Sequence, residues 1–306
     1  MRRRSFVSRI FGGLAGVGAQ RAASLRPGDI PRRKFGKTGI EVTIIGQAGG
    51  RLSMIGRDEA RAVVRRALEL GINFFDNARS YWDGRSEEVF GEVLAPVRKQ
   101  IFLTTKTTAR TRRGAEADLE ASLRALRTDY VDLWQIHGIA EMKEIEQILA
   151  PGGAIEAFEA AKKAGKCRFI GVTCHHDPDV LAEMLRRYRE FDSVFMPLHA
   201  ADPAFLSFEE KVLPIAVEQG LAIQAMKTFA NARLMSVLSA RECLEYALSL
   251  PISTVVVGAI TLGQIEDDAR IAQRFRPLSN SQMAELRRRA AREAGPALED
   301  WKRRPA

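Results

Sequence analysis

The sequence predicts an α/β protein in which eight strand–helix units close into a single-domain (β/α)8 TIM barrel. Short apolar strands alternate with helices from Phe35 onward, and strands such as residues 254–257 are apolar on both faces, as buried parallel strands are. The strand ends recur every 24 to 36 residues, which is the length of one strand–helix unit. They fall near Gly46, Asp76, Lys106, His137, Thr173, Pro197, Met226 and Gly258. The alternative is an open doubly wound sheet, but residues 46–50 lack the Gly-x-Gly-x-x-Gly spacing typical of its first turn.

The individual elements follow from apolar runs and from residues that begin or end helices. We expect strands over residues 42–46, 72–75, 101–105, 130–136, 169–172, 193–196, 221–225 and 252–257. We expect helices over residues 59–70, 86–94, 115–126, 154–164, 178–189, 208–219, 240–250, 262–273 and 281–293. Asp58 is the predicted N-cap of the first helix, and Gly71, Gly165 and Gly220 are predicted helix ends, because glycine accepts the left-handed conformation there.

Composition and charge exclude several classes of protein. The chain has 306 residues, 46% hydrophobic and 28% charged, and no run of eighteen apolar residues, so no stable membrane insertion is expected. Residues 1–34 contain nine basic residues and one acid, so they account for +8 of the net charge of +9. The nearly neutral remainder argues against a nucleic-acid binder. Three cysteines, an odd number without metal-ligand spacing, predict no disulfide framework.

Residues 1–30 differ from the rest of the chain. Arg2, Arg3 and Arg4 precede a glycine-rich apolar stretch over residues 10–19, which ends in small residues. This pattern resembles a twin-arginine export signal, which implies a periplasmic or otherwise exported protein. The alternative is a basic leader on a cytoplasmic enzyme. We therefore predict a leader over residues 1–30 and one barrel domain over residues 31–306.

Four chemically active residues are predicted to meet at one end of the barrel. Asp76, Lys106 and His137 end three successive strands, and Tyr81 follows Asp76 by five residues. Loops at the C-terminal ends of the strands form the active sites of such barrels. A tyrosine can protonate a carbonyl oxygen if a nearby ammonium group, here Lys106, lowers its pKa toward neutrality. Asp76 would hold Lys106 charged, and His137 could donate a hydrogen bond to the same oxygen.

A reduction also needs a source of hydride, which no side chain supplies. A nicotinamide cofactor is therefore implied. The expected partner is a small carbonyl compound, and we expect a monomer.

The chain resembles the aldo/keto reductase superfamily over residues 33–274. The resemblance rests on residues 35–39 and 76–78, on Tyr81, Lys106 and His137, and on residues 171–173. It implies that Asp76, Tyr81, Lys106 and His137 are the catalytic residues. It also implies reduction of aldehydes or ketones with NADPH, with Tyr81 as the proton donor.

The resemblance also implies where the cofactor binds. The implied residues are Thr173, Cys174, Met226, Lys227, Gly258, Thr261, Gln264 and Asp268. Thr173 and Cys174 stand where family members usually have Ser-Asn, and Met226 stands where many have a stacking aromatic. Gly258 and Gln264 replace a lysine and an arginine that bind the 2′-phosphate in many members. NADPH is the expected cofactor and NADH is possible, with backbone amides at the start of the 262–273 helix as candidate phosphate donors.

The sequence is also compatible with three other interpretations. The chain could bind a nicotinamide cofactor as a redox-sensing or regulatory protein with little turnover. It could be a barrel isomerase or lyase with Lys106 as a Schiff-base nucleophile. A metal site could be formed by His175, His176 and His199 with Asp177 and Asp202, although pocket lining or loop hydrogen bonding is favoured for these residues and no metal is predicted.

Overall fold

A computed structural model of the chain describes residues 30–302. The predicted export signal lies outside these residues except for Ile30. Within them, no helix is both long and apolar enough to cross a membrane.

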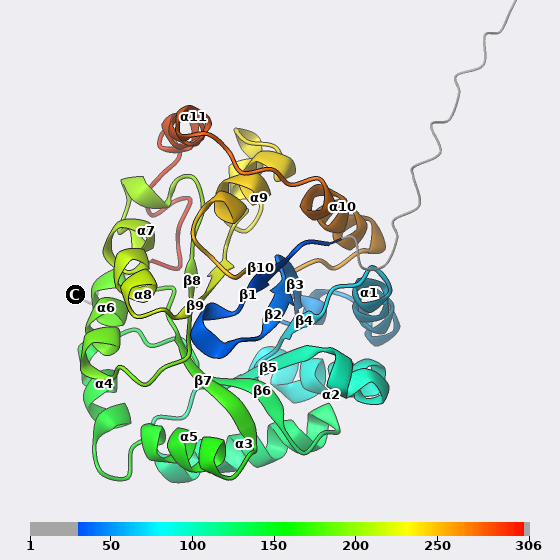
Figure 1. Ribbon diagram of the computed structural model, residues 1–306, viewed down its shortest axis with the longest axis vertical. Coiled ribbons are helices and arrows are strands. Elements are labelled where there is room, and N and C mark those ends of the chain that lie inside the picture. Colours follow the sequence, from blue (N-terminus) through cyan, green and yellow to red (C-terminus); the bar gives the residue numbers. More distant parts are fainter. Residues whose placement is uncertain (1–29, 303–306) are drawn as a thin grey trace, which may run out of the picture.

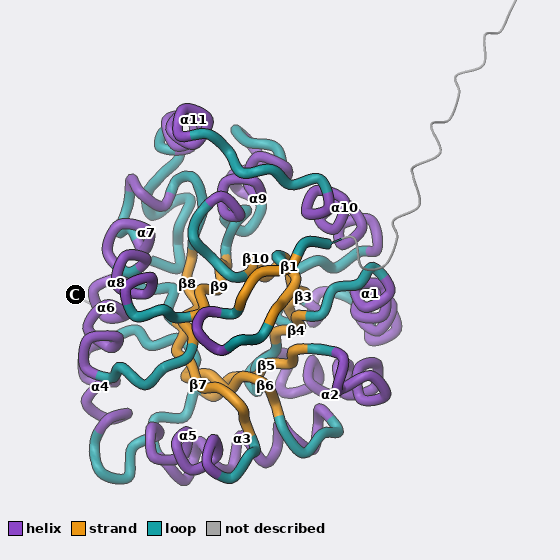
Figure 2. The backbone as a smooth tube through the Cα atoms, viewed as in Figure 1, coloured by secondary structure: helices purple, strands orange, loops and turns teal. Residues whose placement is uncertain are grey.

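Eight parallel strands form a closed barrel, which confirms the predicted fold and excludes the open sheet. Figure 2 shows the strands around one axis with helices outside them. Register pairs such as Val255 with Ile45 join the last strand to the first. The barrel strands are β3 (Ile45–Ala48), β4 (Phe74–Asp76), β5 (Phe102–Thr107), β6 (Val131–Ile136), β7 (Cys167–Thr173), β8 (Ser193–Pro197), β9 (Ala222–Met226) and β10 (Thr254–Val257).

An outer ring of helices covers the barrel (Figure 1). In the described part of the chain these are α1 (Arg57–Glu69), α2 (Arg85–Leu94), α3 (Arg112–Leu126), α4 (Met142–Leu149), α5 (Ala154–Lys163), α6 (Pro178–Arg187), α7 (Phe208–Lys211), α8 (Leu213–Glu218), α9 (Ala240–Ser249), α10 (Leu262–Gln273) and α11 (Asn280–Ala290).

Three details of the predicted helices were wrong. The helix expected over residues 208–219 is divided into α7 and α8, because Pro214 cannot donate a backbone hydrogen bond and restarts the helix at its first turn. Helix α1 begins after Gly56 and not after Asp58, which lies inside the first turn. Helix α4 was not predicted, and a capping box between Glu141 and Glu144 begins it.

A hairpin that the sequence did not suggest closes the bottom of the barrel. Its strands β1 (Arg32–Lys34) and β2 (Glu41–Thr43) are antiparallel, so the strand expected over residues 42–46 is in fact the end of β2 and the start of β3. Phe35, between the two hairpin strands, is fully buried, and its ring centroid lies 4.6 Å from that of Phe102 at the N-terminal end of β5. The hairpin therefore closes the end of the barrel opposite the strand ends that carry Asp76 and Lys106.

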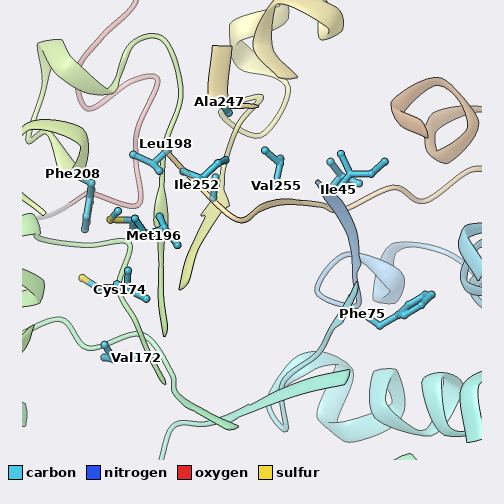
Figure 3. Packing of buried hydrophobic residues seen from close by; sticks show 14 of the residues in the cluster. Ile45, Phe75, Val172, Cys174, Met196, Leu198, Phe208, Ala247, Ile252 and Val255 are labelled. Carbon is cyan, nitrogen blue, oxygen red and sulfur yellow. The ribbon is translucent and has the colours of Figure 1, made fainter. Parts of the chain in front are cut away.

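The main hydrophobic core lies between the strands and the helices. Figure 3 shows outward-facing strand residues, among them Ile45, Phe75 and Val255, in this layer. Phe75 packs edge-on against Phe90 of α2, with ring centroids 6.1 Å apart. Because side chains alternate along a strand, Phe74 and Asp76 on either side of Phe75 point toward the barrel interior.

Candidate active site

The same alternation directs three of the predicted catalytic residues into the barrel mouth. Phe102 belongs to the inner apolar cluster, so Lys106, four residues later on β5, also faces inward. Leu133 of β6 belongs to the same cluster, and His137 follows it by four residues. Asp76, Lys106 and His137 therefore come from neighbouring strands and face the same interior end.

Tyr81 reaches this mouth from the loop after β4. The loop is fixed to the barrel because Asn77 and Arg79 donate backbone hydrogen bonds to Thr104 and Lys106, at 3.1 and 3.0 Å. The short 3-10 turn Tyr81–Gly84 then folds back, with Trp82 in the left-handed conformation at φ 52°. This backbone turns the tyrosine ring toward His137, and the two rings meet edge-on with centroids 5.5 Å apart.

Lys106 is the centre of the group. Its Nζ donates to Asp76 Oδ2 and to the Asn77 carbonyl oxygen, each at 2.7 Å, and lies 3.4 Å from Tyr81 Oη. Thr104 Oγ1 donates to the other oxygen of Asp76 at 2.7 Å. Lys106 and Asp76 are each 1% exposed, so their charges are balanced out of contact with water. The structure thus brings all four predicted catalytic residues together.

The protonation states differ in part from the expectation. Burial raises the pKa of Tyr81, and the nearby Lys106 ammonium only partly opposes this rise. The expected lowering of the Tyr81 pKa toward neutrality is therefore wrong for this state, because burial outweighs the attraction of the cation. Burial lowers the pKa of Lys106, but Asp76 and Tyr81 more than compensate, so its pKa stays above the ordinary value and the ammonium stays charged.

His137 is neutral at physiological pH. Burial and then the charge of Lys106 hold its pKa well below the usual value. Ser80 Oγ lies 3.3 Å from His137 Nδ1. When Ser80 donates to Nδ1, the proton of the neutral ring is on Nε2, which can then donate to a carbonyl oxygen.

A cavity of about 640 Å³ opens above these four residues. It runs from the barrel interior past the ends of β9 and β10 to α10. Six of the eight predicted cofactor residues line it: Thr173, Met226, Lys227, Gly258, Gln264 and Asp268. This volume is in the range of cofactor and ligand sites.

The other two predicted cofactor residues do not line the cavity. Cys174 is fully buried, its Sγ lies 3.4 Å from the carbonyl oxygen of Asp177, and burial raises the pKa of its thiol to about 12. Figure 3 shows Cys174 in the hydrophobic layer behind the strands. Thr261 is the N-cap of α10, and its hydroxyl accepts the backbone N–H of Gln264 at 3.2 Å.

Sequence reasoning missed a pair of cations at the cavity rim. Arg51 Nη2 donates to Asn231 Oδ1 at 2.7 Å, and Lys227 Nζ donates to the same oxygen at 3.2 Å. All three residues line the cavity, and burial lowers the pKa of Lys227. The sequence signal for this pair was Arg51 itself, a cation directly after Gly49 and Gly50, which follow the first barrel strand. Its partner lies 180 residues away, so the sequence could not reveal the contact.

The residues considered as a metal site are in two separate places. His175 lines the cavity, whereas His176 Nδ1 lies 2.8 Å from the carbonyl oxygen of Trp301. His199, Asp202 and Glu299 form a buried group whose ligand atoms lie within 4.8 Å of one another. Lys302 Nζ already contacts both carboxylates, Asp202 at 2.7 Å and Glu299 at 2.5 Å, so an ammonium group fills the position of a cation.

The sequence was compared with known families and proteins. The profile of the aldo/keto reductase family matches residues 45–237. The uncharacterized oxidoreductase YqkF of Bacillus subtilis is 29% identical over 216 residues, which cover 66% of each chain. The L-galactose dehydrogenase of Arabidopsis thaliana is 34% identical over 158 residues, 47% of this chain and 48% of that protein. The aldo-keto reductase YhdN of Bacillus subtilis is 32% identical over 200 residues, 58% of this chain and 56% of that protein. The chain thus matches between 48% and 66% of the length of these relatives.

Solved structures have the same architecture. The holo form of an aldo-keto reductase from Bacillus halodurans superposes with a TM-score of 0.71 at 25% identity, covering 90% of this chain and 98% of that one. An aldo-keto reductase from Klebsiella pneumoniae in complex with NADPH gives a TM-score of 0.70 at 22% identity, covering 86% and 95%. The second likeness concerns the fold alone.

Proposed function

The chain belongs to the aldo/keto reductase family, and we propose on this basis that it reduces an aldehyde or ketone to an alcohol with NAD(P)H. The observation that carries the proposal is the contact series from Asp76 through Lys106 to Tyr81. A buried ammonium group beside a phenol is an arrangement that stabilises the phenolate left after proton donation.

The residues divide the reaction between them. The bound nicotinamide would supply hydride to the carbonyl carbon. Tyr81 Oη gives its proton to the carbonyl oxygen, and its raised pKa means that it carries this proton at neutral pH. Lys106 stabilises the phenolate as it forms, and Asp76 keeps Lys106 charged and oriented. Neutral His137 donates to the same oxygen and fixes the substrate.

The cavity fits a dinucleotide in charge as well as in size. Arg51 and Lys227 share one neutral acceptor, Asn231 Oδ1. A diphosphate would provide the negative charge that this pair lacks. Thr173 and Met226, at the ends of β7 and β9, line the cavity at the barrel mouth and would contact the nicotinamide end.

The isomerase or lyase alternative requires Lys106 to be a free nucleophile. Its Nζ instead donates to two oxygens at 2.7 Å, and its pKa stays above the ordinary value. A charged ammonium group has no lone pair to attack a carbonyl. The geometry therefore favours the reductase over the isomerase or lyase. A measurement of carbonyl turnover distinguishes the reductase from the regulatory alternative.

Substitution Tyr81→Phe tests the proposal. We expect kcat for carbonyl-dependent oxidation of NADH or NADPH to fall by about 10²–10⁴, because general acid catalysis contributes that much. Cofactor affinity, measured by quenching of tryptophan fluorescence, should stay within about threefold, since the phenol is not needed to hold the dinucleotide. The assay would screen aldehydes, ketones and quinones.

The matched control is Tyr188→Phe, which also removes one tyrosine hydroxyl. That hydroxyl donates to Glu159 outside the cavity, so turnover should be unchanged. Equal turnover in Tyr81→Phe and the parent protein would exclude Tyr81 as the acid. Tight cofactor binding without turnover on any carbonyl by the parent protein would favour the regulatory alternative.

A further inference from the structure

We propose that the end of the cavity at α10 selects NADH over NADPH, because it presents carboxylates and no available cation to the adenosine ribose. The inference rests on the proposed function, since it assigns the cofactor of that reaction. It concerns only the part of the cavity furthest from Tyr81.

The position of the catalytic residues fixes the direction of the cofactor. Hydride transfer requires the nicotinamide ring beside Tyr81 and His137, inside the barrel mouth. Helix α10 follows β10 in the chain and lies in the outer ring between α9 and α1, against β3 (Figure 1). Arg51 crosses the rim between these two places, because a Cβ built on Gly258 at the end of β10 would lie 3.1 Å from its Cδ. An extended dinucleotide with its diphosphate at Arg51 and Lys227 therefore brings its adenosine to α10.

Two acids of α10 line this end. Asp268 is only 7% exposed, and its side-chain carboxylate makes no hydrogen bond or ion pair with any other described residue, although it borders the cavity. Burial, followed by the charge of neighbouring Asp267, raises the pKa of Asp268 to about 7. An acidic side chain facing a ribose accepts a hydrogen bond from its 2′-hydroxyl, and this is how many dinucleotide sites recognise NADH. A 2′-phosphate with up to two negative charges would be repelled by the same carboxylate.

Cations that could neutralise a 2′-phosphate are committed elsewhere. Arg270 pairs with Asp267 and does not border the cavity. Arg66 pairs with Glu266 at 2.7 Å, on the side of α10 that packs against α1. Among the described residues that line the cavity, the cationic ones are Arg51, Lys106 and Lys227, and none of them belongs to α10.

Part of the helix start is already occupied by capping hydrogen bonds. Thr261 Oγ1 accepts the backbone N–H of Gln264, and the Gln264 side chain turns back to accept the N–H of Ile260 at 2.9 Å. Two amide groups that could have held a phosphate are therefore already used. The expectation that this helix start donates to a phosphate is weakened, and Gln264 acts as a cap in the place where a cation would be needed.

The test compares two probes that differ only at the ribose, ADP-ribose and 2′-phospho-ADP-ribose. Calorimetric titration at pH 8, where the Asp268 carboxyl is mostly ionised, should give at least tenfold tighter binding of ADP-ribose. Equal or tighter binding of the 2′-phosphate form would overturn the inference. Rising salt should narrow the difference, because it screens the repulsion.

Two variants raise the net charge of α10 by one unit at different places, one by adding a cation and the other by removing an anion. Gln264→Arg should raise the affinity for the 2′-phosphate form relative to ADP-ribose at least tenfold. Glu266→Gln, on the side paired with Arg66, is the matched control and should leave the ratio of the two affinities within about twofold. A similar change in both variants would mean that general charge, and not the α10 end of the cavity, decides the preference.

A third variant separates the diphosphate from the 2′-phosphate. Arg51→Met should weaken both probes by the same factor, because both carry the diphosphate. Selective weakening of the 2′-phosphate form would show that Arg51 holds that group and would overturn the inference. Kinetics with both cofactors distinguish this failure from a failure of the reductase. Turnover that prefers NADPH refutes only the selection, whereas NADH binding without any carbonyl turnover refutes only the reaction.

Discussion

Lys106 illustrates how far single residues could be predicted. Its presence at a strand end and its inward direction follow from the alternation of side chains along β5, as they do for Asp76 and His137. Its two acceptors, Asp76 and the Asn77 carbonyl oxygen, follow from the adjacent strand end. The pKa of Tyr81 could not be predicted in the same way, because it depends on how deeply the folded barrel mouth buries the phenol. Arg51 was missed because its partner Asn231 is distant in sequence.

The ammonium of Lys106 should depend on Asp76 for its charge. In Asp76→Asn, burial is no longer opposed by the carboxylate, so the pKa of Lys106 should fall. Because the charged form stabilises the phenolate, the alkaline limb of the kcat profile should move to lower pH. Measurement of kcat from pH 6 to 10 checks this. Thr104→Val removes a neutral partner of the same carboxylate and should move the limb much less.

His137 should give no acidic limb. Its pKa lies well below the usual value of about 6.5 because of burial and Lys106, so it stays neutral from about pH 6.5 upward. We expect kcat/KM to be independent of His137 ionisation in this range, and His137→Gln to lower kcat/KM without weakening cofactor binding. An acidic limb near pH 6.5 that disappears in the variant would contradict a neutral His137.

At the scale of elements, the regular pattern of strands and helices predicted the barrel but not what closes it. Seven of the eight barrel strands were expected close to their observed positions, because their apolar runs are largely buried, whereas the first barrel strand, β3, begins three residues later than expected. The β1–β2 hairpin was missed because its strands are only three residues long, and β1 consists of three cationic residues without an apolar run. The division of α7 from α8 was readable from Pro214, whereas the hairpin is determined by tertiary contacts with β9.

Gly36 is the residue on which this hairpin depends. Its φ is 53°, and a Cβ there would lie 2.3 Å from the backbone nitrogen of Ala222 in β9. Gly36→Ala should therefore destabilise the fold by about 3 kcal/mol or more, combining backbone strain with a clash. Gly39→Ala, also at positive φ but with no atom within 4 Å of the added Cβ, should cost only about 1–2 kcal/mol. Urea unfolding measures the loss of unfolding free energy in each variant. Equal losses in Gly36→Ala and Gly39→Ala would contradict the close contact of Gly36 with β9.

At the scale of the whole molecule, the C-terminal segment returns to the cavity side of the barrel. Lys302 forms a hydrogen-bonded ion pair with Asp202, which lies 100 residues earlier, and Arg233 pairs with Asp300 at 2.8 Å. Lys227 Nζ, which lines the cavity, lies 5.1 Å from the centre of the Trp301 ring. No periodic signal marks such a return in the sequence. The charged partners are far apart along the chain, so their pairing can be recognised only when the fold is known.

Removing the Lys302 ammonium should therefore affect both stability and the cavity wall. In Lys302→Met, the fully buried Asp202 and Glu299 lose the cation between them, which should cost about 3–5 kcal/mol in urea unfolding. Because Trp301 precedes Lys302 and contacts Lys227, tryptophan fluorescence and cofactor affinity should change together. The triple variant Lys302→Met, Asp202→Asn, Glu299→Gln leaves no uncompensated charge and should recover much of the stability.

Chelator treatment should leave the parent protein unchanged, since an ammonium group already lies between the carboxylates. A fall in Tm with chelator would instead reveal a metal at His199, Asp202 and Glu299.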